Sequence, residues 1–213
     1  CDQWIKKCLT VVSLRTVWEL RGVPCLEIEE TQPNKKAIGT SRTFGYEVKH
    51  FADLEEAVCA YIANAAENLR SQGSMAGHVH VYVETRQFKD RVCYSNSAGA
   101  VVRPPTAYTP RLIETAKKIL KQIYREGLSY KRCGIILMNL SPQESGEDYL
   151  FEEKYEGSGR QKLMDIMDRY NSQTNEAKIF LAAEGSGKSW YMKQAHKSKR
   201  FTTRWDELLE IKV

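Results

Sequence analysis

The sequence contains no C-x-x-C pair, although it has six cysteines, and this absence argues against the common structural zinc sites and redox motifs. Most of the cysteines stand among apolar neighbours. Free thiols that are mostly buried are therefore expected, rather than disulfides or a zinc site. The six positions are Cys1, Cys8, Cys25, Cys59, Cys93 and Cys133.

Long apolar runs are also absent. No run approaches the roughly 18 residues that a membrane-spanning helix needs. The N-terminus lacks the charged start, apolar middle and small-residue cleavage site of a signal peptide. We therefore expect no membrane partner and a cytoplasmic location. The chain begins with Cys1 rather than Met, and we expect it to be a piece of a longer protein.

A complete phosphate-binding loop is missing as well, although the stretch IFLAAEGSGKSWY at residues 179–191 approaches one. In the motif G-x-x-x-x-G-K-[ST], backbone N–H groups of a glycine-rich turn bind phosphates. Gly187, Lys188 and Ser189 fit its end, but Ala182 stands where the first glycine belongs. We predict a glycine-rich hairpin turn. An ATP-dependent enzyme is the alternative, and it would be supported if ATP stabilised the fold and Lys188→Ala abolished the effect.

What the sequence does have is an uneven distribution of charge. Its 213 residues are 42% hydrophobic, enough for one large or two small domains with a core. The net charge is only +5, but residues 35–142 carry 16 basic and 9 acidic side chains, whereas both flanking segments are slightly acidic. A basic domain of this kind suits a polyanion if its charges share one face, and solvated surface lysines are the alternative.

The hydrophobic patterns of residues 35–142 predict an α+β fold. HVHVYVETR alternates strictly, as in a half-buried strand, and Asp53 and Gly73 are expected to cap a long helix. The order β-α-β-β-α-β makes a two-layer sandwich whose helices cover one sheet face and leave the other open. The predicted elements are strands at 35–48, 78–86, 92–103 and 130–140, and helices at 54–72 and 110–126.

The flanking segments differ in composition from this middle part. A helix over 14–21 and a polar tether around 31–36 precede it. After Pro142 the chain becomes acidic and contains Gly and Ser, and a further helix is expected at 160–170. We therefore predict three parts, which are 1–34, 35–142 and 143–213.

Side chains on the open sheet face are the candidates for binding. Hydroxyl groups beside Arg and Lys suit phosphate oxygens, and aromatic platforms for stacked bases are sparse, so contact with a duplex backbone fits best. The candidates are Thr40, Ser41, Arg42 and Thr43 from the first strand, His78, His80, Arg86 and Lys89 from the second and its exit, and Ser95 and Asn96 from the third.

Catalytic and metal-binding sets are not evident. His78, His80 and Glu84 share one strand face, but a zinc site with Cys ligands at matching spacing is lacking, so no metal is expected. Asp165 and Asp168 lie three residues apart on a predicted helix and are interpreted as a solvated face rather than paired catalytic carboxylates. No catalytic residues are predicted in this chain.

Several segments, in the same order and covering essentially the whole chain, resemble the C-terminal half of the UmuC-type Y-family translesion DNA polymerases. They are RTVWELRGVPCLEIEE (15–30), KKAIGTSRTFG (35–45), LEEAVCAYIANAAENLR (54–70), YSNS (94–97), YKRCGIILMNLSP (130–142) and FTTRWDELLEI (201–211).

This resemblance implies a role for each part. Residues 1–34 would be the end of the thumb and a linker, 35–142 the little finger, which grips primer-template DNA by its backbone, and 143–213 a UmuC-type extension that docks partners. The DNA-binding residues it implies are Lys36, Thr40, Ser41, Arg42 and Thr43 on the first strand, with Arg86, Lys89 and the YSNS segment, which includes Ser95 and Asn96, along the same duplex.

The resemblance also bears on catalysis and on partners. The metal-binding carboxylates of the family belong to a palm domain upstream of Cys1, so Mg²⁺ and nucleotidyl transfer are expected of a longer parent and not of this chain. The family's sliding-clamp motif, Gln-x-x-Leu-Phe, corresponds to Glu147, Leu150 and Phe151. A carboxylate only accepts hydrogen bonds, so clamp binding should be weakened. A UmuD-type accessory subunit is the other expected partner.

The sequence therefore favours a DNA-gripping and partner-docking fragment of an error-prone polymerase of the SOS response to DNA damage. The alternative is a stand-alone interaction module whose basic face is merely solvated.

Overall fold

The computed structural model describes residues 2–26, 33–85, 93–143, 158–173, 179–187, 190–192 and 197–208. Its contacts divide the chain into two compact units, Cys1–Asn34 and Lys35–Val213, which are described separately.

The first unit contains helices α1 (Asp2–Cys8) and α2 (Val11–Leu20). The Asp2 carboxylate joins them, because it accepts hydrogen bonds of 2.8 Å from the Trp18 indole N–H and from the Arg21 guanidinium. These two bonds lower the pKa of Asp2. Gly22 follows α2 with φ of +81°, a conformation that suits glycine at a helix end. The predicted helix thus exists but begins earlier, and α1 was not predicted.

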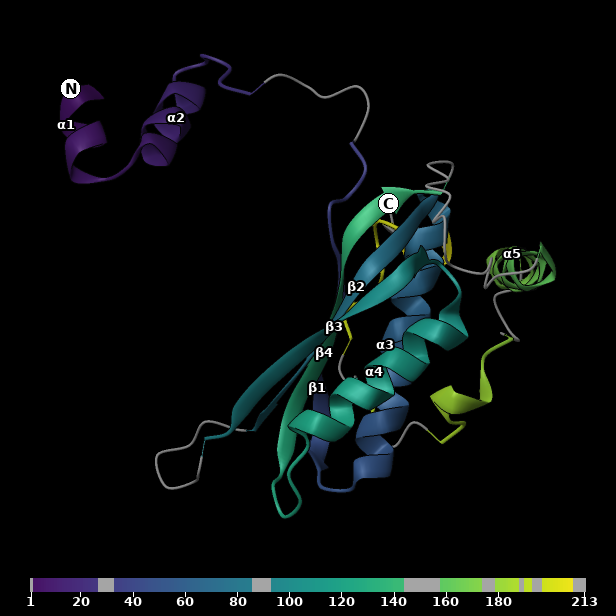
Figure 1. Cartoon of the computed structure of the whole chain (residues 1–213). Helices are drawn as coiled ribbons and strands as arrows, with labels where there is room; N and C mark the ends of the chain where they lie inside the picture. Colours follow the sequence, from purple (N-terminus) through teal and green to yellow (C-terminus); the bar gives the residue numbers. More distant parts are fainter. Residues whose placement is uncertain are drawn as a thin grey trace. The chain divides into compact units, whose positions relative to one another are not determined.

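The second unit is built on a four-stranded antiparallel sheet with strand order β1-β4-β2-β3. The helices α3 and α4 cover one face of this sheet (Figure 1). The predicted α+β fold with the order β-α-β-β-α-β is therefore confirmed. The elements are β1 (Ile38–Val48), α3 (Phe51–Ser71), β2 (Ser74–Thr85), β3 (Ser95–Thr106), α4 (Thr109–Ile123) and β4 (Tyr130–Pro142).

The core lies between the sheet and the two helices. Val79, Val81 and Val83 of β2 are fully buried, as their alternation predicted. They pack with apolar residues of the helices and of the central strand β4. The largest of these fully buried side chains include Leu54, Ile62, Leu69, Leu112, Leu120, Ile135 and Leu137.

Helix boundaries differ from the prediction at the start of α3 and at the end of α4, which stops at Ile123 rather than near residue 126. Asp53 lies in the first turn of α3, and His50 is the N-cap residue without a side-chain cap bond, so the predicted N-cap was wrong. An acidic side chain in the first turn still favours the helix through its dipole. Gly73 follows α3 with φ of +66°, as expected for a helix end.

The C-terminal extension contains α5 (Ser158–Gln173) and two short 3₁₀ turns, η1 (Ala182–Glu184) and η2 (Trp205–Glu207). The hairpin predicted around residues 185–187 is not found, because residues 179–187 and 190–192 contain no strand. Gly185 instead ends η1 with φ of +66°.

The cysteines for which the structure gives a position are free thiols. Burial raises the pKa of Cys59 to about 11 and also raises that of Cys133, and both are fully buried. Cys8 and Cys93 are exposed and Cys25 is partly buried, so the expectation of mostly buried thiols holds for two of the five. Within the described ranges, no helix has the length and apolar character needed to cross a membrane.

Two neighbouring isoleucines of β4 test this packing. Ile135 faces the helices and is fully buried, whereas Ile136 faces the other way and is half-buried. Ile135→Ala should lower the free energy of unfolding by about 2–5 kcal/mol, because it leaves a cavity. Ile136→Ala should cost only about 1 kcal/mol. Urea unfolding of both variants measures the difference, and equal losses would contradict the assignment of the two faces.

Candidate nucleic-acid interface

The open face of the sheet is made of cross-strand rows, because opposite residues in antiparallel strands share a face. One row contains Thr43, Arg132, Glu84 and Ser95. The next row on the same face contains Ser41, Gly134, Tyr82 and Ser97, and the third contains Gly39, Ile136, His80 and Gly99. Four hydroxyl-bearing serines and threonines therefore lie along the two edge strands, with Arg132 and Tyr82 between them.

Arg132 is the basic residue of these three rows. Its guanidinium donates a hydrogen bond of 3.1 Å to the Ser41 hydroxyl and lies 5.8 Å from the centre of the Tyr82 ring. The Glu84 carboxylate is 4.0 Å away, and both charged side chains are nearly half exposed. An exposed ion pair of this length stabilises by about 1 kcal/mol at most. Arg132 is therefore positioned by its neighbours but remains available to an anion.

Next to Arg132 the end of the sheet is hollowed by about 310 Å³. The Lys131 ammonium lines this hollow and donates a hydrogen bond of 2.7 Å to the Phe44 carbonyl. Two cations beside hydroxyls make a suitable environment for phosphate oxygens, although Glu84 opposes an anion. The lining residues are Thr43, Glu84, Thr85, Cys93, Tyr94, Ser95, Lys131 and Arg132.

Two glycines allow large side chains to lie flat on this face. A Cβ atom at Gly134 would come within 2.5 Å of the Tyr82 ring, and one at Gly99 within 2.4 Å of the His78 ring. Both distances are shorter than any real contact, so a side chain at either position would displace the ring above it. Around these two glycines the open face therefore presents the rings of Tyr82 and His78.

Three of the predicted site residues lie on the other side of the sheet. Thr40 pairs with Ile135 and Arg42 with Cys133, both of which face the helices. Asn96 pairs with Val83, and its amide donates a hydrogen bond of 2.8 Å to the Tyr94 hydroxyl. The prediction of an open-face position was wrong for these three, because side chains alternate along a strand and residues 40–43 cannot share one face.

The other predicted residues divide into two groups. Ser41, Thr43 and Ser95 lie on the open face as expected, and Lys36 is exposed just before β1. Arg86, Lys89, Glu147, Leu150 and Phe151 fall outside the described residues.

Arg132 and Tyr82 were not predicted as site residues, whereas Ser97 belongs to the YSNS segment expected along the duplex. Arg132 precedes the apolar run of β4, which indicates a central strand but does not assign Arg132 to a face. Counting in twos from Ile136 through Gly134 would have assigned Arg132 to the open face. His78, His80 and Glu84 share this face, but no group of three metal-ligating residues that could hold an ion is found among the described residues.

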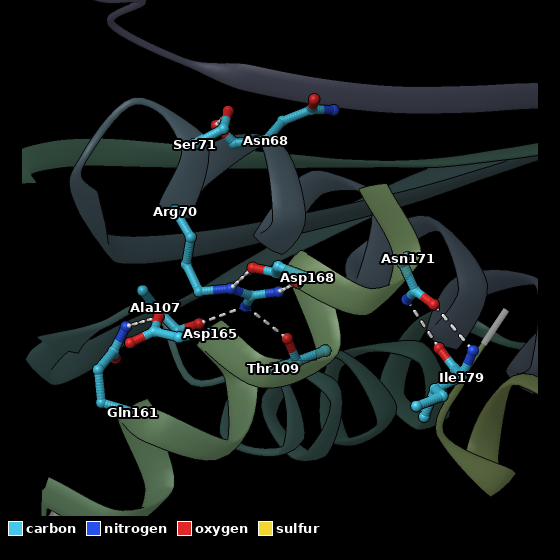
Figure 2. A network of polar contacts seen from close by, with 10 residues as sticks. All are labelled: Asn68, Arg70, Ser71, Ala107, Thr109, Gln161, Asp165, Asp168, Asn171 and Ile179. Carbon is cyan, nitrogen blue, oxygen red and sulfur yellow. Dashed lines mark hydrogen bonds and ion pairs between the residues drawn. The ribbon is translucent and has the colours of Figure 1, made fainter. Parts of the chain in front are cut away.

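A second polar cluster lies on the helix side and joins α5 to α3 (Figure 2). The Arg70 guanidinium makes two parallel bonds to the Asp168 carboxylate, of 2.6 and 2.8 Å. It also donates bonds of 2.8 Å to the Ala107 carbonyl and the Thr109 hydroxyl. The Arg70 side chain is only 7% exposed and that of Asp168 27%. The interpretation of Asp168 as part of a solvated face was therefore wrong, because a distant arginine binds it.

Asp165 behaves differently from Asp168. Its carboxylate accepts a hydrogen bond of 3.1 Å from Gln161 on the same helix, and the contact is exposed. The two aspartates therefore do not form a catalytic pair.

The impB/mucB/samB family C-terminal domain matches residues 35–150, and a domain of unknown function, DUF4113, matches residues 161–211. Protein UmuC of Salmonella typhimurium is 36% identical over 209 residues, which are 98% of this chain and 50% of that protein. Protein MucB of Escherichia coli is 33% identical over 202 residues, 94% of this chain and 47% of that protein.

Solved structures give a weaker likeness. DinB from Sulfolobus solfataricus is 12% identical with a TM-score of 0.39, and the match covers 65% of this chain and 38% of that one. An insertion ternary complex of Dbh DNA polymerase has a TM-score of 0.38 at 12% identity, covering 66% and 38%. The chain spans about half the length of the curated relatives it matches. Because the matched domain covers more than half of its residues, the chain belongs to the impB/mucB/samB family and includes that family's C-terminal domain.

Proposed function

We propose that this chain is the DNA-gripping and partner-docking part of an error-prone translesion DNA polymerase that acts in the SOS response in the cytoplasm. Its membership of the impB/mucB/samB family and its similarity to UmuC support the proposal. The parent would use Mg²⁺ held by carboxylates of a palm domain. No role in nucleotidyl transfer is proposed for the residues of this chain.

The observation that carries the proposal is the open sheet face, with Arg132 in the row next to the end of the sheet. Serine and threonine hydroxyls flank Arg132 on both edge strands, and the region 35–142 supplies the positive charge of the chain. Cations provide affinity for a nucleic acid through counterion release, while hydroxyls position its backbone.

The ligand that fits this face best is a duplex. Tyr82 is the one Phe, Tyr or Trp among these three rows, beside the imidazole of His80, whereas a surface for single strands uses several large aromatic rings for successive bases. Hydroxyl groups on both sides of one arginine suit the regularly spaced phosphates of a double helix. We therefore propose contact with the backbone of primer-template DNA and no base-specific recognition.

Partner docking is proposed for residues 143–213. The clamp motif would be Glu147, Leu150 and Phe151, with the two apolar residues as its anchor. A UmuD-type accessory subunit is the second proposed partner of this segment.

Fluorescence anisotropy of a primer-template duplex, titrated with the chain at several salt concentrations, tests the DNA proposal. The logarithm of the affinity should fall linearly with the logarithm of the salt concentration. Arg132→Ala should weaken binding to every sequence and reduce the salt slope by about one unit, because one phosphate contact is lost.

Two variants that each remove one positive charge elsewhere serve as controls. Lys121→Ala removes an exposed cation of α4, and Arg42→Ala removes one from the helix side of β1. Both should leave the salt slope within about 0.3 units of the unchanged chain, since a distant charge adds little at physiological ionic strength. Equal effects of all three variants would indicate nonspecific attraction, and no binding at low salt would favour the stand-alone interaction module.

The clamp motif makes a separate prediction. Glu147→Gln should tighten binding to a sliding clamp by about tenfold, because an amide both donates and accepts hydrogen bonds while the carboxylate only accepts. Leu150→Ala combined with Phe151→Ala should abolish it. Surface plasmon resonance on immobilised clamp measures both, and a double-alanine variant that still binds would contradict the proposed anchor.

A further inference from the structure

The glycine-containing stretch near the C-terminus is bound to the helix layer of the sheet domain. We call residues 179–192 the strap, of which 179–187 and 190–192 are described. Its 3₁₀ turn η1 contacts α3, and Leu181 and Ala183 pack against the hydrophobic core. The strap is therefore part of the folded second unit.

Trp190 anchors the strap. Its side chain is 3% exposed and packs edge-on against Tyr61 of α3, with ring centres 5.6 Å apart, and against Phe44 of β1 at 6.4 Å. The Trp190 carbonyl accepts a hydrogen bond of 3.3 Å from the Gly45 N–H. Because β1 is an edge strand, this bond satisfies a backbone donor that has no neighbouring strand.

Gly185 allows the strap to approach α3 closely. Its φ is +66°, and a Cβ atom there would lie 2.3 Å from the carboxyl carbon of Glu56. Gly187, two residues later, has nothing within 4 Å of the position of a Cβ atom. Gly185 therefore allows close contact with a helix, whereas Gly187, which matches the phosphate-binding motif, makes no such contact.

The ion pair between Arg70 and Asp168 is a second anchor. It binds α5 to the same helix α3 that the strap contacts, and Met164 of α5 is 1% exposed. The two anchors therefore bind successive parts of the extension to one helix.

The Trp190 anchor is weakened by two buried polar atoms. Neither the Trp190 indole N–H nor the Tyr61 hydroxyl has a hydrogen-bond partner among the described residues. An unsatisfied buried polar group destabilises the buried state, because water would bind it in the open state. Opening of the strap would let water form hydrogen bonds with the Trp190 indole N–H and the Tyr61 hydroxyl.

We infer that α5 and the described parts of the strap, 179–187 and 190–192, form a latch, which opens and closes on α3 while the sheet stays folded, with Trp190 and Asp168 as coupled anchors. The closed latch lies on the helix side and leaves the open sheet face uncovered. The open latch uncovers Phe44 and Tyr61 and frees Trp190. This inference does not depend on DNA binding.

Hydrogen exchange of single amides in the whole chain tests the latch. The Gly45 amide reports its state, because its acceptor is the Trp190 carbonyl, and the amide of fully buried Val81 reports global unfolding. Gly45 should exchange faster than Val81 in the unchanged chain. Asp168→Asn should accelerate Gly45 exchange about tenfold, as expected for coupled contacts, and leave Val81 unchanged.

Tryptophan fluorescence gives an independent readout. The other three tryptophans, Trp4, Trp18 and Trp205, are 62%, 36% and 89% exposed. With these three replaced by Phe, acrylamide quenching reports Trp190 alone. Quenching should be weak in the otherwise unchanged chain and stronger in Asp168→Asn.

Matched controls keep the test specific. Asp165→Asn changes an aspartate of the same helix that bonds only locally, and it should alter neither readout. Gly185→Ala should loosen the strap without touching the ion pair, whereas Gly187→Ala should not. The latch is overturned if Gly45 and Val81 exchange together in all variants, if Asp168→Asn leaves Gly45 unchanged, or if Trp190 is fully quenched from the start.

Discussion

The register of β4 between β1 and β2 is the constraint on which the rest of this structure depends. Ile135 and Leu137 of β4 are fully buried beneath α3 and α4, and this fixes which residues of the neighbouring strands face the core. The remaining residues of the same strands, including Arg132 and Tyr82, must then form the opposite face. A shift of one residue would exchange the two sets, so burial of the core also defines the proposed DNA surface.

The two faces have different tasks in this account. On the helix side, Arg70 of α3 binds Asp168 of the C-terminal extension. Trp190 of the extension packs against α3 and bonds to the edge strand β1. The open side carries the hydroxyls and Arg132. The contacts of α5 and Trp190 are with the helix side, and the proposed DNA surface is the other face of the sheet.

Much of the sheet domain could be predicted from the sequence, because its patterns are local. The alternation of Val79, Val81 and Val83 defines β2 and its buried face. The same rule, applied to residues 40–43, would have excluded Thr40 and Arg42 from the open face. The extension could not be predicted in this way. Asp168 is 98 residues from Arg70, and no local pattern indicates such a contact.

Hydroxyl-radical footprinting of side chains, with and without a primer-template duplex, tests the central claim most directly. Tyr82 and Met138 lie on the open face, whereas Tyr170 and Met192 are exposed residues of the extension. The account predicts that the duplex protects Tyr82 and Met138 from oxidation and leaves Tyr170 and Met192 unchanged. Protection of Tyr170 and Met192 with Tyr82 still oxidised would contradict it, because the duplex would then bind the helix side.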